Sequence, residues 1–352
     1  MLGQTFLSAL NFCRDIPVPS FLYWVSGGAD HSCLPRARRA GLPCSAAGTF
    51  LSLPYSLLIV CLIALITGCD HKTPAPPATT TTKSPTVASL VPSATDLILG
   101  MGAGDHLVAV SNFDREPAAA RLPRVGDYQT IDWEKLAQLH PNLIITYYGP
   151  GHIPPGFAER TRELGMQNVN LQFNRLTDVF EALGTLGYAL SEREKAQALG
   201  GRLKAEIESL RPELATRPSR PVRAVIVTDP SGLDFAGRNN YLNDVLETVG
   251  GENAVTAPGY VALDREAIAA LKPDVILHLL PGADEPTKRQ AAAFWDAFPN
   301  LPAVQKHHVY LFTEPYMMTP GVHIADVAAK FAAAVRSAEE LASHPTTNNA
   351  TH

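Results

Sequence analysis

The sequence predicts an α/β protein of two similar lobes joined by a long helix. A helix–strand unit occurs twice, as IDWEKLAQLHPNLIIT over residues 131–146 and as LDREAIAALKPDVILH over residues 263–278. Between the copies, residues 177–210 are charged and amphipathic, which favours a helical connector. At 352 residues, the chain is long enough for two domains, each with its own core.

Both copies of the repeat follow the same local chemistry. Asp132 and Asp264 occupy predicted N-caps, and Glu134 and Glu266 follow in the first turn, where the positive end of the helix dipole favours a carboxylate. In each copy a proline then ends the helix before a short aliphatic strand. The repeat predicts one equivalent acidic helix start on each lobe, the alternative being a chance recurrence of helix–strand units.

The first lobe is expected to open with a short apolar strand over residues 87–91. Ser93 and Asp96 have the spacing of a capping box and predict a helix from Asp96 to Met101. A strand over residues 107–110 follows, and the first copy of the repeat comes after it.

The connector and the second lobe follow the same alternation. Residues 177–189 have a helical pattern, and Ser191 with Glu194 forms a second predicted capping box for a helix that ends near Leu210. Beyond the connector we expect a strand over 222–228, a helix over 243–249, the second repeat copy, a helix containing Trp295, a strand over 309–312 and a helix over 322–341.

The first 68 residues are predicted to be a leader. Residues 57–66, LLIVCLIALI, form an apolar run of signal-peptide length with arginines upstream, and small residues precede Cys69 as in a bacterial lipobox. This pattern predicts that Cys69 becomes the lipidated N-terminus, with an uncleaved membrane span as the alternative. An over-extended start would explain residues 1–40. Residues 69–86, rich in Pro and Thr, are expected to form a tether.

Composition excludes several classes of function. A formal net charge of −5 offers no basic surface for nucleic acid. All five cysteines lie in the first 69 residues, so disulfides, cysteine-bound zinc and cysteine nucleophiles are excluded from the folded part. The predicted folded parts are an N-terminal lobe over 87–173, connecting helices over 174–217, a C-terminal lobe over 218–344 and a tail over 345–352.

Aromatic residues gather in the loops at predicted strand ends. Phe113, Tyr128, Tyr147 and Tyr148 fall in such loops of the first lobe, where ligands bind in open α/β sheets. Tyr260 precedes the second repeat copy as Tyr128 precedes the first, each six residues before its glutamate. Rings that converge on one edge would suit a large flat ligand.

In order and spacing, these elements resemble the substrate-binding proteins of vitamin B12, siderophore and haem ABC importers. The matching motifs are SLVPSATD over residues 89–96, GAGD over 102–105, LPRVG over 122–126, the two repeat copies and the lipobox. The resemblance covers residues 87–341. It implies the class III periplasmic binding protein fold, in which two Rossmann-like α/β lobes are joined by one long backbone helix.

The resemblance also implies a function, with a cobalamin or related corrinoid bound between the lobes and no cofactor of the protein's own. Glu134 and Glu266 would dock on an ABC permease dimer. The protein would be a monomer, anchored by its lipid in the cell envelope, in the periplasm or on the outer face of the cytoplasmic membrane. The positions implied for ligand binding are Phe113, Tyr128, Tyr147, Phe235 and Tyr260, and the loop residue Tyr148 completes the predicted set. The chain departs from the family pattern at Asp234, an aromatic site in relatives, and at residues 319–321, where Thr-Pro-Gly replaces Ser/Gly-Pro-Arg.

Three alternatives stay open at this point. A haem or iron–siderophore receptor of the same class would use cationic side chains, for which Arg115 and Arg238 are the candidates. An enzyme would need a nucleophile or an acid–base pair, and no such motif is present, so we expect no catalytic residues. A zinc or manganese receptor would use histidines, but no pair has helical ligand spacing, and we expect no metal site. The histidines are His106, His152, His278, His307, His308 and His323.

Overall fold

The computed structural model describes residues 84–211 and 220–343. The predicted leader, Cys69, most of the tether and the predicted tail lie outside these residues. Within the described part of the chain, no helix has both the length and the apolar composition needed to cross a membrane.

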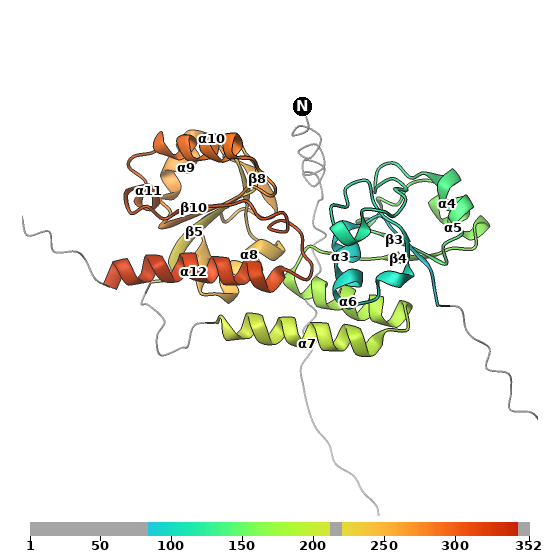
Figure 1. The fold of residues 1–352 in the computed structure, drawn as a ribbon. Coiled ribbons are helices and arrows are strands. Elements are labelled where there is room, and N and C mark those ends of the chain that lie inside the picture. The colour runs from blue at the N-terminus through green and yellow to red at the C-terminus, as the bar shows by residue number, and fades with distance from the viewer. Residues whose placement is uncertain (1–83, 212–219, 344–352) are drawn as a thin grey trace, which may run out of the picture. The chain divides into compact units, whose positions relative to one another are not determined.

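The first lobe is built on a four-stranded parallel sheet in the order β2-β1-β3-β4. Figure 1 shows β3 and β4 of this sheet together with the helices α3, α4 and α5. Each strand consists of three or four residues, and β1 and β3 are fully buried. The strands are β1 (Val87–Ser89), β2 (Leu107–Ala109), β3 (Leu143–Thr146) and β4 (Gln167–Asn170), and the α-helices are α3 (Pro92–Gly100), α4 (Trp133–Leu139) and α5 (Phe157–Glu163).

The second lobe contains a six-stranded mixed sheet in the order β10-β9-β5-β6-β8, with β7 paired to β5. The pairs among β5, β7, β9 and β10 are parallel, whereas β6 is antiparallel to β5 and to β8. The strands are β5 (Val222–Val227), β6 (Asp234–Ala236), β7 (Gly251–Asn253), β8 (Tyr260–Ala262), β9 (Val275–Leu279) and β10 (Val309–Phe312). The helices are α8 (Tyr241–Thr248), α9 (Arg265–Leu271), α10 (Glu285–Asp296), α11 (Pro302–Gln305) and α12 (Ile324–Ser343).

Two helices connect the lobes, α6 (Leu176–Ala189) and the longer α7 (Arg193–Ser209). α7 packs against α6 and against α12 of the second lobe. The prediction of a capping box at Ser191 is wrong, because Ser191 takes a left-handed conformation (φ 60°) in the turn between the helices. The N-cap of α7 is Glu192, whose side chain makes no capping bond.

The predicted capping box of the first helix is also wrong. α3 begins at Pro92, four residues before the predicted start at Asp96, because a proline is pre-organised for the first helical position. Asp96 therefore lies inside the helix, where it is buried rather than exposed at a helix start. The Asp96 carboxylate accepts a hydrogen bond from the backbone N–H of Val322 in the second lobe.

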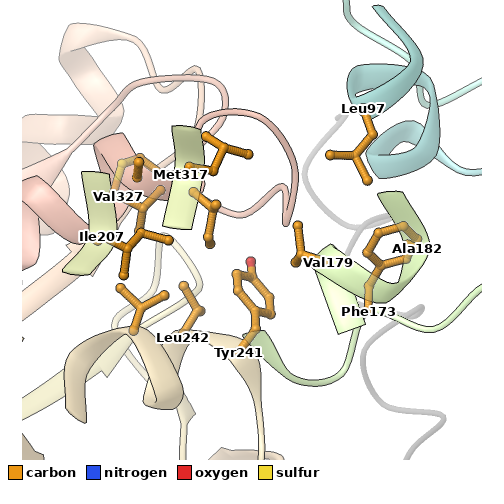
Figure 2. Packing of buried hydrophobic residues seen from close by; sticks show 14 of the residues in the cluster. Leu97, Phe173, Val179, Ala182, Ile207, Tyr241, Leu242, Met317 and Val327 are labelled. Atoms are coloured by element: carbon orange, nitrogen blue, oxygen red, sulfur yellow. The ribbon is translucent and has the colours of Figure 1, made fainter. Parts of the chain in front are cut away.

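The largest core joins the connecting helices to both lobes. Figure 2 shows Leu97 from α3 and Val179 from α6 in one cluster with Tyr241, Met317 and Val327 of the second lobe. Fully burying one such aliphatic side chain contributes about 1.5–3 kcal/mol. Two smaller cores complete the lobes, one around Ile144 in the first lobe and one around Trp295 in the second. The described fold is the two-lobed α/β architecture that the sequence predicts.

Candidate ligand-binding and docking surfaces

The two copies of the repeat form the same structure in both lobes. Asp132 Oδ1 accepts a hydrogen bond from the backbone N–H of Lys135 (2.9 Å), and Asp264 Oδ1 accepts one from Ala267 (2.8 Å). Each helix has seven residues and ends on a left-handed residue, His140 or Lys272, directly before the proline. β3 and β9 then lie inside their sheets, flanked by strands on both sides. The predicted N-caps and the predicted strands of the repeat are confirmed.

The glutamates of the repeat are placed equivalently on the two lobes. Glu134 and Glu266 are each the second residue of their helix and are exposed. Over residues 84–211 and 220–343, neither carboxylate forms an ion pair or a hydrogen bond with another side chain. An exposed carboxylate held at a helix start is available to a cationic group of a partner.

In the first lobe, two of the predicted aromatic residues lie next to each other. The ring centroids of Phe113 and Tyr128 are 6.3 Å apart, and the rings are tilted by 35°. Tyr128 follows Asp127, whose carboxylate accepts the backbone N–H groups of Gln129 and Thr130 (both 2.9 Å) and so fixes this loop. Both rings are half-buried and keep part of their surface exposed.

Tyr147 and Tyr260 come from different lobes and both border the core that the lobes share. Tyr147 is 37% exposed, and its hydroxyl donates to Asn174 Oδ1 (2.7 Å). Tyr260 begins β8 and packs on the core that the lobes share. Burial raises the pKa of the Tyr241 hydroxyl well above its ordinary value, and the nearby Tyr260 and Tyr147 hydroxyls raise it further. The Tyr147 ring packs against Phe173, with ring centroids 6.4 Å apart, and Phe173 belongs to the same core cluster as Tyr241.

Two other residues of the predicted set are core residues, which corrects the expectation that they face a ligand. Tyr148 is 5% exposed and packs edge-on against Phe157, with ring centroids 5.6 Å apart. Burial raises the pKa of Tyr148 to about 12. Phe235 is the middle residue of β6 and is fully buried. In both cases the neighbouring elements cover the face of the strand or loop that the side chain occupies.

The histidines and arginines considered for other ligands do not form a common site in the described part of the chain. His278 is fully buried between a backbone carbonyl of Asp229 (2.7 Å to Nε2) and the indole N–H of Trp295 (3.1 Å to Nδ1), and burial lowers its pKa. Within the described ranges, no group of three or more His, Cys, Asp or Glu side chains could hold a metal ion. Arg115 and Arg238 are both exposed, and Arg115 reaches Gly282 of the second lobe.

A groove of about 990 Å³ lies elsewhere on the first lobe, between β4 and the turn from α6 to α7. Its lining includes Asn168, Asn170 and Tyr188 but none of the predicted ligand-binding residues. Tyr188 is 67% exposed, and the guanidinium of Arg193 lies 4.5 Å from the centre of its ring. Sequence reasoning missed this exposed tyrosine, because it lies in a helical pattern rather than in a loop.

Known proteins of similar sequence are binding proteins of transport systems. A family model described as periplasmic binding protein matches residues 87–316. A vitamin B12-binding protein of Vibrio cholerae is 26% identical over 261 residues, which are 72% of this chain and 90% of the relative. An uncharacterised ABC transporter substrate-binding lipoprotein of Bacillus subtilis, YvrC, is 24% identical over 64% of this chain and 71% of its own.

Solved structures agree with the fold. The periplasmic vitamin B12-binding protein BtuF of Vibrio cholerae aligns with a TM-score of 0.61 at 25% identity, over 72% of this chain and 97% of that one. The periplasmic heme-binding protein HutB of the same species aligns with a TM-score of 0.60 at 21% identity, over 71% and 98%.

Proposed function

Because the chain belongs to the periplasmic binding protein family, we propose that it is the substrate-binding protein of an ABC importer and that its ligand is cobalamin or a related corrinoid. The observation that carries the choice of ligand is that Tyr147 and Tyr260, one from each lobe, both border the core that the lobes share, Tyr147 through its contact with Phe173. Rings contributed by both lobes are suited to hold a large flat molecule between them. The similarity to vitamin B12-binding relatives supports the same ligand.

Four rings make up the proposed ligand-contacting set: Phe113, Tyr128, Tyr147 and Tyr260. Phe113 and Tyr128 form a tilted pair on the first lobe, and the hydrogen bond to Asn174 fixes the ring of Tyr147. Rings that are held before the ligand arrives lose little conformational freedom on binding, which favours affinity. Tyr148 and Phe235, which are buried, are left out of this set.

The proposed delivery step uses the glutamates of the repeat. Glu134 and Glu266 occupy equivalent positions on two similar lobes, so together they can engage two copies of one permease subunit. Each carboxylate would accept charge-assisted, bidentate hydrogen bonds from arginines of the permease. The binding protein itself would act as a monomer that carries out no chemical step.

Binding of cyanocobalamin to the purified protein tests the choice of ligand. We expect corrin absorbance bands to stay with the protein after gel filtration and calorimetry to report a one-to-one complex. Tyr128→Ala and Tyr260→Ala should each weaken binding about 10- to 100-fold, because each removes a ring that contacts the ligand.

Tyr188→Ala is the matched control, since Tyr188 is an exposed tyrosine of the first lobe outside the proposed set. It should bind as the wild type does, and thermal unfolding should show that all three variants are folded. Unchanged affinity in Tyr128→Ala and Tyr260→Ala would place the site elsewhere. A Soret band or a ferric charge-transfer band after incubation with haem or a ferric siderophore, without corrin binding, would favour the other receptors of this class.

The lipid anchor is a second part of the proposal, and Cys69 carries it. The lipobox before Cys69 and the Pro/Thr-rich residues after it support acylation at this position. The relative YvrC is named a lipoprotein, which is consistent with such an anchor. We expect Cys69→Ala to remain unacylated and unprocessed in a bacterial host, as mass spectrometry of the membrane fraction can measure. Wild-type protein recovered wholly soluble and unacylated from a host with the lipoprotein machinery would contradict the proposal.

A further inference from the structure

A short segment between β4 and α6 holds the ring of Tyr147 at two points. The Tyr147 hydroxyl donates a hydrogen bond to Asn174 Oδ1 (2.7 Å), and the ring packs against Phe173, with ring centroids 6.4 Å apart. Phe173 is buried in the core that the lobes share, where Figure 2 shows it in one cluster with Tyr241 of α8. The orientation of the Tyr147 ring therefore depends on where residues 173–174 lie.

Two carboxylates fix the backbone that leads from this segment into α6. Asp178, in the first turn of α6, accepts the backbone N–H groups of Asn174 and Arg175 (both 2.9 Å). The next amide, that of Leu176, donates to Asp244 Oδ2 (2.9 Å), although Asp244 belongs to α8 of the second lobe. The first amides of a helix have no partner within the helix itself, so these carboxylates set where α6 begins.

The side chain of Arg175 forms a bidentate pair with the same carboxylate of the second lobe. Its Nε donates to Asp244 Oδ2 (2.8 Å), and its Nη2 donates to Asp244 Oδ1 (2.7 Å). The Asp244 side chain is 13% exposed, and among the described residues its carboxylate bonds only to Arg175 and Leu176. All of these bonds go to the segment that carries Asn174 and Phe173, and none goes to α8 itself.

We propose that Asp244 is a positioning residue for ligand binding, because its carboxylate holds the segment on which the Tyr147 ring rests. A bidentate pair restricts orientation as well as distance, which a single hydrogen bond does not. The ring is thereby held before the ligand arrives, and less conformational freedom is lost on binding. The inference rests on the proposed role of Tyr147 in ligand binding and adds to it a residue that acts from the second lobe.

The ring can be observed in the ligand-free full chain. With a fluorinated tyrosine at position 147, the ¹⁹F signal of the wild type should differ from that of the free amino acid, because the ring is packed. In Asp244→Ala and Arg175→Ala the signal should move toward the free value, since the segment loses bonds to the second lobe. Glu247→Gln is the matched control, because it removes an exposed acid of the same helix that forms no ion pair among the described residues, and its signal should match the wild type.

Affinity for cyanocobalamin separates positioning from a general effect on the fold. Calorimetry should find Asp244→Ala about tenfold weaker than the wild type, the size expected on losing charge-assisted hydrogen bonds. Asp244→Asn keeps the size of the side chain and should bind about threefold more weakly, and it carries the same comparison if thermal unfolding shows that Asp244→Ala does not fold. In the Tyr147→Ala background there is no ring to position, so either change at Asp244 should alter affinity by less than about twofold.

Two results would overturn the proposal. One is an unchanged ¹⁹F signal in both Asp244→Ala and Arg175→Ala, which would mean that the carboxylate does not hold the ring. The other is a loss of affinity that persists in full in the Tyr147→Ala background, which would give Asp244 a general structural role. If the ¹⁹F signals change as expected but the wild type does not bind cyanocobalamin, the positioning of the ring is supported and the choice of ligand is wrong.

Discussion

Reversing the charge of both repeat glutamates is expected to abolish uptake while leaving ligand binding intact. In the Glu134→Lys/Glu266→Lys variant, two exposed carboxylates that have no side-chain partner among residues 84–211 and 220–343 become lysines facing the proposed arginines. Breaking a charged pair in an interface costs about 2–5 kcal/mol, and like charges add repulsion. Uptake of labelled cobalamin by cells that depend on this protein should therefore fall at least about 100-fold, with partial losses in the single variants.

The chain offers a close control for this prediction. Glu285 is also an exposed glutamate in the first turn of a helix whose N-cap is an aspartate, Asp284, but α10 is not part of the repeat. Glu285→Lys should transport normally. Calorimetry should find the affinity of the double variant for cyanocobalamin within about twofold of the wild type. Full transport by the double variant would disprove docking through these glutamates, and lost ligand binding would assign them to the ligand site.

Replacing Asp114 with asparagine is expected to stabilise the folded protein above pH 6. Asp114 is 5% exposed, and neither of its carboxylate oxygens has a hydrogen-bond partner among the described residues. The nearby Thr95 hydroxyl donates to Ser89 Oγ at 3.0 Å instead. Burial raises the pKa of Asp114 from 3.8 to about 6, although the positive charge of Arg124 opposes the rise.

The direction of the pH dependence follows from that rise. Between pH 3.8 and about 6 the folded protein binds more protons at Asp114 than the unfolded chain does, so the free energy of unfolding falls as the pH rises through this window. Above about pH 6, Asp114 is ionised in the folded protein as well, and burying its charge lowers the free energy of unfolding by at most about 3 kcal/mol. Asp114→Asn should therefore be more stable than the wild type by about 1–3 kcal/mol at pH 8, and the advantage should disappear near pH 4.

Urea unfolding at both pH values measures this difference. Asp105→Asn, which removes an exposed carboxylate, should match the wild type at both. If Asp114→Asn were instead less stable at pH 8, the carboxylate would have a stabilising partner, such as a bound water or ion, and the prediction would be wrong.

The sequence alone determined the features whose causes are local. Both repeat helices begin at their predicted N-caps, because an aspartate bonds to an amide only three residues ahead. Both stop before a proline, since proline cannot continue a helix. The strand over residues 309–312 also lies where the pattern predicts it. The sequence therefore predicted two equivalent acidic helix starts, and from them two similar lobes, because the interactions that form each start are local in the chain.

Tertiary structure decided what depends on contacts between distant residues. Asp96 was assigned to a helix cap from its neighbour Ser93, but its partner is Val322 on the other lobe. Tyr148 was predicted from its place at a strand end and Phe235 from the family resemblance, yet other elements pack over both side chains and bury them. Residue spacing records which face of its own element a side chain occupies. Which faces are covered, and which carboxylates are buried, depends on how elements far apart in the chain pack together.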